Sequence, residues 1–212
     1  MEFKKIEGSI YYTPAERDLI NHLRPHAAAQ WQGKLPGKRW GARTQRDNFK
    51  KKIKVALEDL QGEFCCFCGL ELGETSAAQI EHIAPKGDYP QFMFINNNLA
   101  LACSLCNGFE KKGEIETIEI YNDDYEQCTF LIVHPYRDDP WEHFEVVDYD
   151  KGDIIFRYLT PQAERSRDIF DLDGPKQIRA RGKHFMHREL STHKQTEDLL
   201  KEILKNKYTR KK

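Results

Sequence analysis

The sequence has no long hydrophobic run. No stretch approaches the roughly 18 consecutive apolar residues that a membrane-spanning helix needs. The first residues, MEFKKIEGSI, also lack the apolar segment of a secretory signal. Both absences predict a cytoplasmic protein that makes no membrane contact, in a reducing compartment where cysteines rarely form disulfides.

The chain also has no internal repeat, no low-complexity linker and almost no net charge. Its 212 residues, 39% of them hydrophobic, are enough for one core and a small second lobe. The net charge of −1 hides a basic run at 34–54, with a balance of +8, and an acidic run at 114–153, with a balance of −11. The basic run could follow phosphates, and a solvated surface is the alternative for both runs. Near-neutrality gives little long-range attraction for nucleic acid, so tight binding would need a partner protein.

Cysteine is present six times, and four of these residues form two C-x-x-C pairs, Cys65/Cys68 and Cys103/Cys106. Two residues between the cysteines let each pair turn both sulfurs toward one ion, and two such pairs complete the tetrahedral ligand set of zinc. A redox pair is the alternative, but no thioredoxin-like βαβ pattern surrounds either motif. Cys66 could replace Cys65, although the resulting C-x-C spacing suits zinc less well.

Helices and strands are expected where capping signals, apolar spacing and turn residues define them. Thr13-Pro14-Ala15-Glu16 combines an N-cap, a proline at the first helical position and a capping-box glutamate. The expected helices are 14–24, one that includes 49–60, 104–112, 161–170, 175–190 and 196–207. The expected strands are 78–83, 99–103, 129–135, 143–150 and 153–159, with KGD as the turn between the last two. This order predicts an α+β fold.

An acid and a histidine, Glu81 and His82, lie between the two cysteine pairs near the end of an expected strand. Such a pair offers one metal ligand and one general base at adjacent positions, and a solvated surface position is the alternative for the dipeptide alone. Because side chains alternate along a strand, both can serve one site only where the strand ends or bulges, and Pro85 favours an ending there. Asn107 directly follows Cys106, so zinc would aim its amide at the same pocket; a helix-capping role is the alternative.

With these residues in this order, the sequence resembles the zinc-containing branch of the HNH endonucleases. The matching elements are CCFC (65–68), IEHIAPK (80–86), NNNLALAC (96–103) and SLCNGFEKKG (104–113). A closer resemblance is to the HNH subunit of Septu-type and retron-linked antiphage systems, in which an HP-x-x-D-x-P-x-x-HF segment follows. Here that segment reads HPYRDDPWEHF, at 134–144. The resemblance implies a zinc-stabilised ββα-metal core with flanking helices and a small additional β/α lobe.

The resemblance also implies roles for individual residues. His82 would activate the attacking water, Glu81 and Asn107 would hold one magnesium or manganese ion, and Asn98 would orient the ring of His82. Lys86 and Lys111 would face substrate phosphates. Asn98 precedes Leu99 as the family pattern asks, while Asn96 and Asn97 stay open as alternatives for the central position. Cleavage of DNA or RNA would leave a 5′-phosphate, and an ATPase of the ABC or SMC-like type is the implied partner.

Three regions are expected along the chain: an N-terminal helical region at 1–62, the zinc-stabilised HNH core at 63–113, and a C-terminal β/α region packed on that core at 114–212. The predicted function is a metal-dependent HNH endonuclease that acts as the effector nuclease of a bacterial antiphage system. The alternative is a non-catalytic zinc module that binds nucleic acid or a partner protein. A third possibility is an assembly subunit whose own catalytic centre is degenerate.

Overall fold

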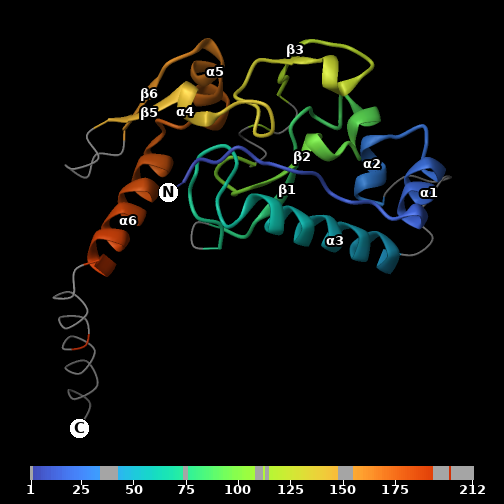
Figure 1. Ribbon diagram of the computed structural model, residues 1–212, viewed down its shortest axis with the longest axis horizontal. Helices are drawn as coiled ribbons and strands as arrows, with labels where there is room; N and C mark the ends of the chain where they lie inside the picture. Colours follow the sequence, from blue (N-terminus) through green and yellow to red (C-terminus); the bar gives the residue numbers. More distant parts are fainter. Residues whose placement is uncertain are drawn as a thin grey trace.

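The computed structural model describes residues 2–33, 43–73, 76–107, 112, 115–147, 155–192 and 201, which form helices and three small sheets (Figure 1). The helices are α1 (Pro14–His22), α2 (Ala28–Trp31), α3 (Arg43–Gln61), α4 (Pro140–His143), α5 (Pro161–Phe170) and α6 (Pro175–Thr192). The antiparallel pairs are β1 (Gln79–His82) with β2 (Leu99–Ala102), β3 (Ile118–Ile120) with β4 (Thr129–Phe130), and β5 (Phe144–Val147) with β6 (Ile155–Tyr158). Short 3-10 helices lie at Pro90–Phe92, Asn96–Asn98 and Tyr125–Gln127. This mixture agrees with the expected α+β class, and no described helix is long and apolar enough to cross a bilayer.

The β1–β2 hairpin lies at the centre of the molecule (Figure 1). Gln79 pairs with Ala102 and His82 pairs with Leu99, so the strand that carries Glu81 and His82 ends at His82. Strand β2 is buried on both faces because its alternating side chains enter two hydrophobic clusters. Ala100 and Ala102 belong to a cluster around the cysteines, here called the cysteine-side cluster. Leu99 and Leu101 belong to a second one, the α3-side cluster.

Helix α3 supports the hairpin from below in the view of Figure 1. Its apolar residues recur at helical spacing, and Phe49, Ile53 and Leu57 are all buried in the α3-side cluster. At the end of the helix, the side chain of Gln61 donates to the carbonyl of Leu101 at 2.7 Å and accepts from its N–H at 2.8 Å. One amide thereby satisfies both backbone groups of a residue in β2 and fixes α3 against the hairpin.

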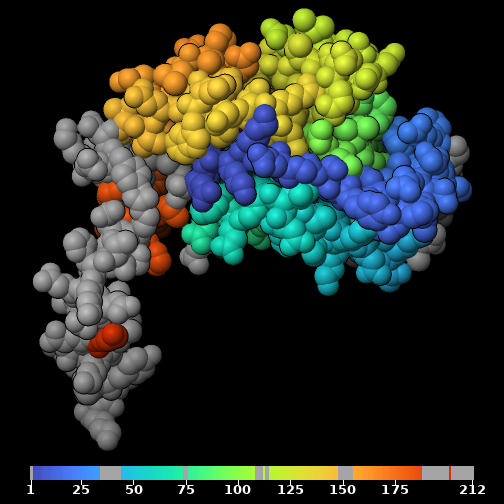
Figure 2. All heavy atoms as spheres, in the orientation of Figure 1, coloured from blue at the N-terminus to red at the C-terminus, as the bar shows by residue number. Residues whose placement is uncertain are grey.

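The N-terminal residues cross the seam between the knuckle that carries Cys65 and Cys68 and the loop at 131–139 (Figure 2). The N–H of Glu2 donates to the carbonyl of Gly69, and the N–H of Ile6 donates to that of Pro135. Phe3 stacks on Phe144, with ring centres 5.0 Å apart. This strap ties the cysteine region to the C-terminal half of the chain.

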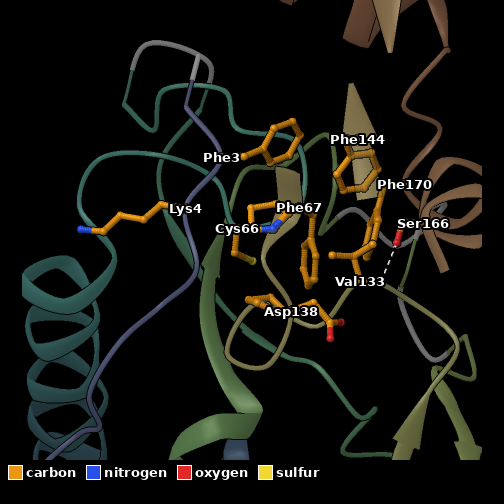
Figure 3. Close-up of a pocket in the computed structure, with 11 residues that line it drawn as sticks. Phe3, Lys4, Cys66, Phe67, Val133, Asp138, Phe144, Ser166 and Phe170 are labelled. Carbon is orange, nitrogen blue, oxygen red and sulfur yellow. Dashed lines mark hydrogen bonds between the residues drawn. The ribbon is translucent and has the colours of Figure 1, made fainter. Parts of the chain in front are cut away.

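The C-terminal half packs on the first cysteine knuckle through aromatic rings. Phe170 of α5 is fully buried and stacks on Phe67 of the knuckle, with ring centres 4.1 Å apart. In Figure 3 these rings surround a small cavity together with Phe3 and Phe144. Its volume of about 10 Å³ is room for about one water molecule. The three expected regions of the chain therefore make direct contacts across the described residues.

The strand expected at 129–135 is wrong beyond Phe130, where β4 ends. Ile132 and Val133 are buried, but they lie in a loop. The reason is that side chains take the backbone donors that a strand partner would need. Val133 donates its N–H to Ser166 Oγ at 3.0 Å, as the dashed line in Figure 3 marks. The N–H of His134 goes to Asp138 Oδ2 at 2.6 Å, and the next residue, a proline, has no N–H.

The other expected elements fall into two groups. Both strands of the predicted ββα unit and the helices α1, α3, α5 and α6 are present, and each predicted end lies within a few residues of the observed one. The helix expected at 104–112 begins as a turn, and residues 108–111 lie outside the described residues, as do the KGD turn and all but Lys201 of the helix expected at 196–207. Strand β3 and the short helices α2 and α4 were not expected, because each has too few residues for a periodic pattern.

Candidate metal centre and active site

The four cysteines of the two C-x-x-C pairs converge on one point. Their sulfur atoms lie within 4.8 Å of one another, and the four residues are at most 2% exposed. Cys68 Sγ and Cys103 Sγ are 3.7 Å apart, close to the about 3.8 Å that a tetrahedron with Zn–S bonds of about 2.3 Å requires. This cluster can hold a zinc ion. In the first pair, the residue that joins Cys68 in the cluster is Cys65 and not Cys66.

Hydrogen bonds from outside the ligand set support the cluster. The N–H of Cys103 donates to Cys65 Sγ at 3.4 Å, which links the two knuckles. From α6, Gln177 Nε2 donates to Cys106 Sγ at 3.3 Å. Burial raises the pKa of the Cys68 and Cys106 thiols, so a cation is needed to keep both as thiolates. Donors of this kind orient metal ligands and disperse the charge on thiolate sulfur.

His82 sits at the end of β1 with its ring buried against two partners. Its Nε2 lies 3.2 Å from the carbonyl oxygen of Met93, which can only accept a hydrogen bond. The ring proton therefore sits on Nε2, and Nδ1 carries the lone pair of a base. Trp31 of α2 contacts the ring edge to face, with centres 4.6 Å apart and planes at 84°. Burial and the charges of Lys86, Lys112 and Lys50 hold the pKa of His82 well below its usual range, so the ring stays neutral.

Asn98 is fully buried and binds the backbone of the loop between β1 and β2. Its Oδ1 accepts from the N–H of Ala84 at 2.6 Å, and its Nδ2 donates to the carbonyl of Phe92 at 3.0 Å. Phe92 precedes Met93, whose carbonyl holds the His82 ring. Asn98 thus fixes the loop that orients His82, while Asn96 donates to the carbonyl of Ile10 and Asn97 to Glu126. All three asparagines lie in this loop, and Asn98 is the one whose side chain donates to the residue before Met93.

Glu81 is buried beside a lysine that the sequence did not single out. Lys112 is fully buried, and its ammonium lies 2.6 Å from Glu81 Oε1 and donates to the carbonyl of His82 at 2.6 Å. One cation thus holds both the carboxylate and the end of β1. A divalent metal bound by Glu81 would have to share this carboxylate with the Lys112 ammonium or displace it.

Asn107 lies beside the same face of β1 as Glu81. Its Nδ2 donates to Gln79 Oε1 at 3.1 Å. Gln79 and Glu81 are two residues apart in the strand, so their side chains project to the same side. The oxygen atoms of Glu81 and Asn107 are hard donors of the kind that magnesium and manganese take, usually together with water and substrate phosphate. Among the described residues, the four cysteines are the one group of three or more His, Cys, Asp or Glu side chains with metal-site geometry.

The two lysines expected to face phosphate differ in what the structure says of them. Lys86 lies in the loop after β1, close enough for its charge to depress the pKa of both His82 and Lys50. Lys111 lies outside the described residues. Sequence reasoning missed Trp31, Lys112 and Gln177, since each lies outside the matched motif or has an unremarkable spacing within it.

The segment at 134–144 is structural in its contacts. His134 is hydrogen-bonded to Tyr125 Oη at 2.9 Å through Nε2 and accepts from the N–H of Tyr136 at 3.2 Å. Asp139 caps α4 by accepting from the N–H of Trp141 at 3.0 Å. His143 Nδ1 is 2.6 Å from Thr160 Oγ1. These side chains join the C-terminal elements to one another and form no cluster with metal-site geometry among the described residues.

The fold and the site define a mixed α+β protein in which a four-cysteine centre lies beside a buried Glu-His pair. No family model matches the chain. It is similar to the Septu protein PtuB of Bacillus thuringiensis, at 32% identity over 101 residues that cover 47% of this chain and 35% of that protein. It is also similar to protein ea31 of Escherichia phage lambda, at 32% identity over 134 residues covering 58% and 41%. A PtuB of Bacillus mycoides strain KBAB4 is 28% identical over 140 residues covering 58% and 47%.

The chain thus spans less than half the length of each curated relative that it matches. Two of the three relatives carry the Septu name. That name agrees with the resemblance of the motif and links the chain, distantly, to Septu-type proteins.

Proposed function

We propose that this chain is a metal-dependent endonuclease of the HNH type that works in a Septu-type antiphage system. The observation that carries the proposal is the neutral, oriented His82, whose proton is fixed on Nε2 by the Met93 carbonyl and whose Nδ1 is the basic atom. Its neighbour Glu81 and the nearby Asn107 offer oxygen donors on an adjacent face. The similarity to two Septu PtuB proteins supports the biological setting.

In this mechanism, His82 Nδ1 takes a proton from a water molecule while the water oxygen bonds to phosphorus. The bond from phosphorus to the leaving oxygen then breaks, and solvent protonates that oxygen. A magnesium or manganese ion at Glu81 and Asn107 would stabilise charge on the scissile phosphate and the leaving oxygen. Lys86 and Lys111 would contact phosphates. Zinc at the four cysteines would be structural, since it would join the knuckle that precedes β1 in the sequence to the knuckle that follows β2.

The partners of the proposed nuclease are nucleic acid, as DNA or RNA, and an ATPase subunit of the ABC or SMC-like type. The small net charge of −1 supports a requirement for a partner, because the chain by itself attracts polyanions weakly at long range.

Cleavage of plasmid DNA and of total RNA, with magnesium or manganese and with or without an ATPase encoded beside the gene, tests the proposal. We expect His82→Ala to lose about 10²- to 10⁴-fold in rate, which is the usual contribution of a general base. His187→Ala, at an exposed position on α6, is the matched control and should cut like the wild type. Absence of cutting by the wild type under all of these conditions would overturn the nuclease assignment.

A non-catalytic zinc module is the second candidate, and one observation favours it. The Glu81 carboxylate already forms an ion pair with the Lys112 ammonium, and the Asn107 amide nitrogen donates a hydrogen bond to Gln79. A module of this kind would need the four cysteines but not His82. Binding of manganese, measured by calorimetry on wild type and Glu81→Gln, separates the two: the nuclease requires binding that Glu81→Gln weakens, and the module requires none.

A further inference from the structure

Two residues outside the motif segment complete the surroundings of His82. Trp31 comes from the short helix α2 and is only 5% exposed, so its indole is fixed in the α3-side cluster. On one side it meets the His82 ring, with centres 4.6 Å apart. Trp31 also contacts Lys50, whose ammonium lies 4.7 Å from the Trp31 ring centre. The three side chains form a continuous row of contacts from α3 to the end of β1.

Lys52 and Lys54 of α3 take part in the described ion pairs, and Lys50 does not. Lys52 is ion-paired with Glu16, and Lys54 lies 3.8 Å from Glu58. Asp47 acts on Lys50, but its carboxylate is hydrogen-bonded by Arg46 at 2.7 Å. Lys50 is half-buried over an aromatic ring, a position in which an ammonium loses part of its hydration.

Lys50 and Lys86 place two positive charges close to His82. Burial and the charges of Arg46 and Lys86 lower the pKa of Lys50, which means that the two lysines repel each other. Both also act on the neutral ring of His82. An anion that lies near both ammonium groups is attracted by each of them. A phosphodiester of nucleic acid is the anion that the chemistry of His82 calls for.

We propose that Lys50 and Lys86 form a phosphate-binding pair beside His82, and that Trp31 is the positioning residue that holds Lys50 above the histidine. The pair takes one backbone phosphate of a DNA or RNA strand next to the bond that is cut. This assignment rests on the proposed nuclease function and names a substrate contact that comes from α3.

Salt-dependent binding tests the proposal with the zinc-loaded full chain and no added magnesium. The probes are a fluorescein-labelled short DNA duplex and a labelled single-stranded RNA, and the readout is the slope of log affinity against log salt. Lys50→Gln should weaken binding and reduce the slope by about 1, the value of one phosphate contact. Lys54→Gln, on the same helix, is the matched control and should keep the wild-type slope. Equal slopes for wild type and both variants, or no binding of either probe, would overturn the proposal.

Trp31 is tested by a pair of substitutions. Trp31→Phe keeps a ring under Lys50 and should retain wild-type affinity. Trp31→Leu removes the ring and should lose about two- to fivefold in affinity, the size of an exposed cation–π contact. Equal affinity in both variants would show that Trp31 does not position Lys50. If Trp31→Leu fails to fold, the comparison of Trp31→Phe with Lys50→Gln still decides whether the lysine is the phosphate ligand.

These outcomes are distinct from failure of the nuclease assignment. A protein that binds with a Lys50-dependent slope but never cuts would retain the phosphate pair and lose the nuclease function. A protein that cuts through His82 with unchanged slopes in Lys50→Gln would retain the nuclease function and lose the pair.

Discussion

His134 shows what burial does to a titratable side chain in this fold. Its Nδ1 accepts from the N–H of Tyr136, so the ring proton sits on Nε2 and is donated to Tyr125 Oη at 2.9 Å. The hydroxyl of Tyr125 in turn donates a hydrogen bond to the carbonyl of Asn97 at 3.0 Å. Burial, with a smaller effect of the Arg137 charge, lowers the pKa of His134 to about 3. The neutral ring is therefore part of the folded structure over the whole ordinary pH range.

This lowered pKa predicts a loss of stability in acid. An unfolded histidine takes up a proton near pH 6.5, while the folded ring resists protonation down to about pH 3. The unfolded state therefore binds more protons below pH 6.5, and the free energy of unfolding falls as the pH decreases through that window. From pH 6.5 to pH 5 the wild type should lose about 2 kcal/mol more than His134→Gln does in urea unfolding. Parallel losses in the two proteins would contradict the prediction, and His187→Gln is the control.

The sequence located the residues of the candidate site that are close together in the chain. Cys65 and Cys68 could be predicted from the C-x-x-C spacing, and Glu81 and His82 from their adjacent positions between the two cysteine pairs. Trp31 and Lys112 could not, since nothing in the local sequence marks an indole or an ammonium that only the folded chain brings against β1. The expected link between Asn98 and His82 is indirect for the same reason: it passes through a backbone carbonyl.

At the scale of secondary structure, α5 and α6 act as supports of the cysteine centre. Phe170 ends α5 and stacks on Phe67, which directly precedes Cys68 in the first C-x-x-C pair. Gln177, in the first turn of α6, donates to the sulfur of Cys106. The two helices therefore restrain both knuckles, although neither helix supplies a metal ligand.

Phe170→Ala should destabilise the protein strongly. The ring is fully buried, so its loss leaves a cavity at the first knuckle and costs about 3–5 kcal/mol of unfolding free energy. Ile178→Ala, at a position on α6 that is 45% exposed, is the control and should change stability by about 0.5 kcal/mol or less. Urea unfolding of the zinc-loaded proteins measures both, and similar midpoints for the two variants would refute the supporting role of α5.

Apolar patterns predicted β1, β2 and the longer helices because those elements bury one stripe or one run against a partner. The same reasoning failed at 131–135, where an equally apolar run is buried as a loop. There the hydroxyl of Ser166 and the carboxylate of Asp138 take the backbone donors. A sequence pattern records which side chains are buried, but it does not record which distant side chain satisfies the backbone.

At the scale of the whole molecule, β2 joins the two hydrophobic clusters. Its alternating residues belong to the cysteine-side cluster and the α3-side cluster, so neither cluster can open without exposing one face of the strand. The N-terminal strap and Gln61 add further links across the same region. The three expected segments, which meet at residues 62 and 113, therefore share buried surface.

We expect the two clusters to unfold together. Trp31 reports on the α3-side cluster, and Trp141 reports on the other through its contact with Phe3, at 5.8 Å between ring centres. Variants with only one of these two tryptophans should give urea transitions with the same midpoint, as a two-state unfolding requires. Midpoints that differ between the two reporters would show two independently stable units.

The cover that Gln177 and α6 give to Cys106 has a kinetic consequence. All four cysteines are at most 2% exposed, so a chelator in solvent could not reach a zinc ion held by them while the molecule stays closed. The metal would exchange only during brief openings in which the helix leaves the knuckle. The lifetime of bound zinc would then measure how often α6 detaches, and a metal buffer would equilibrate slowly with the folded protein whatever its affinity.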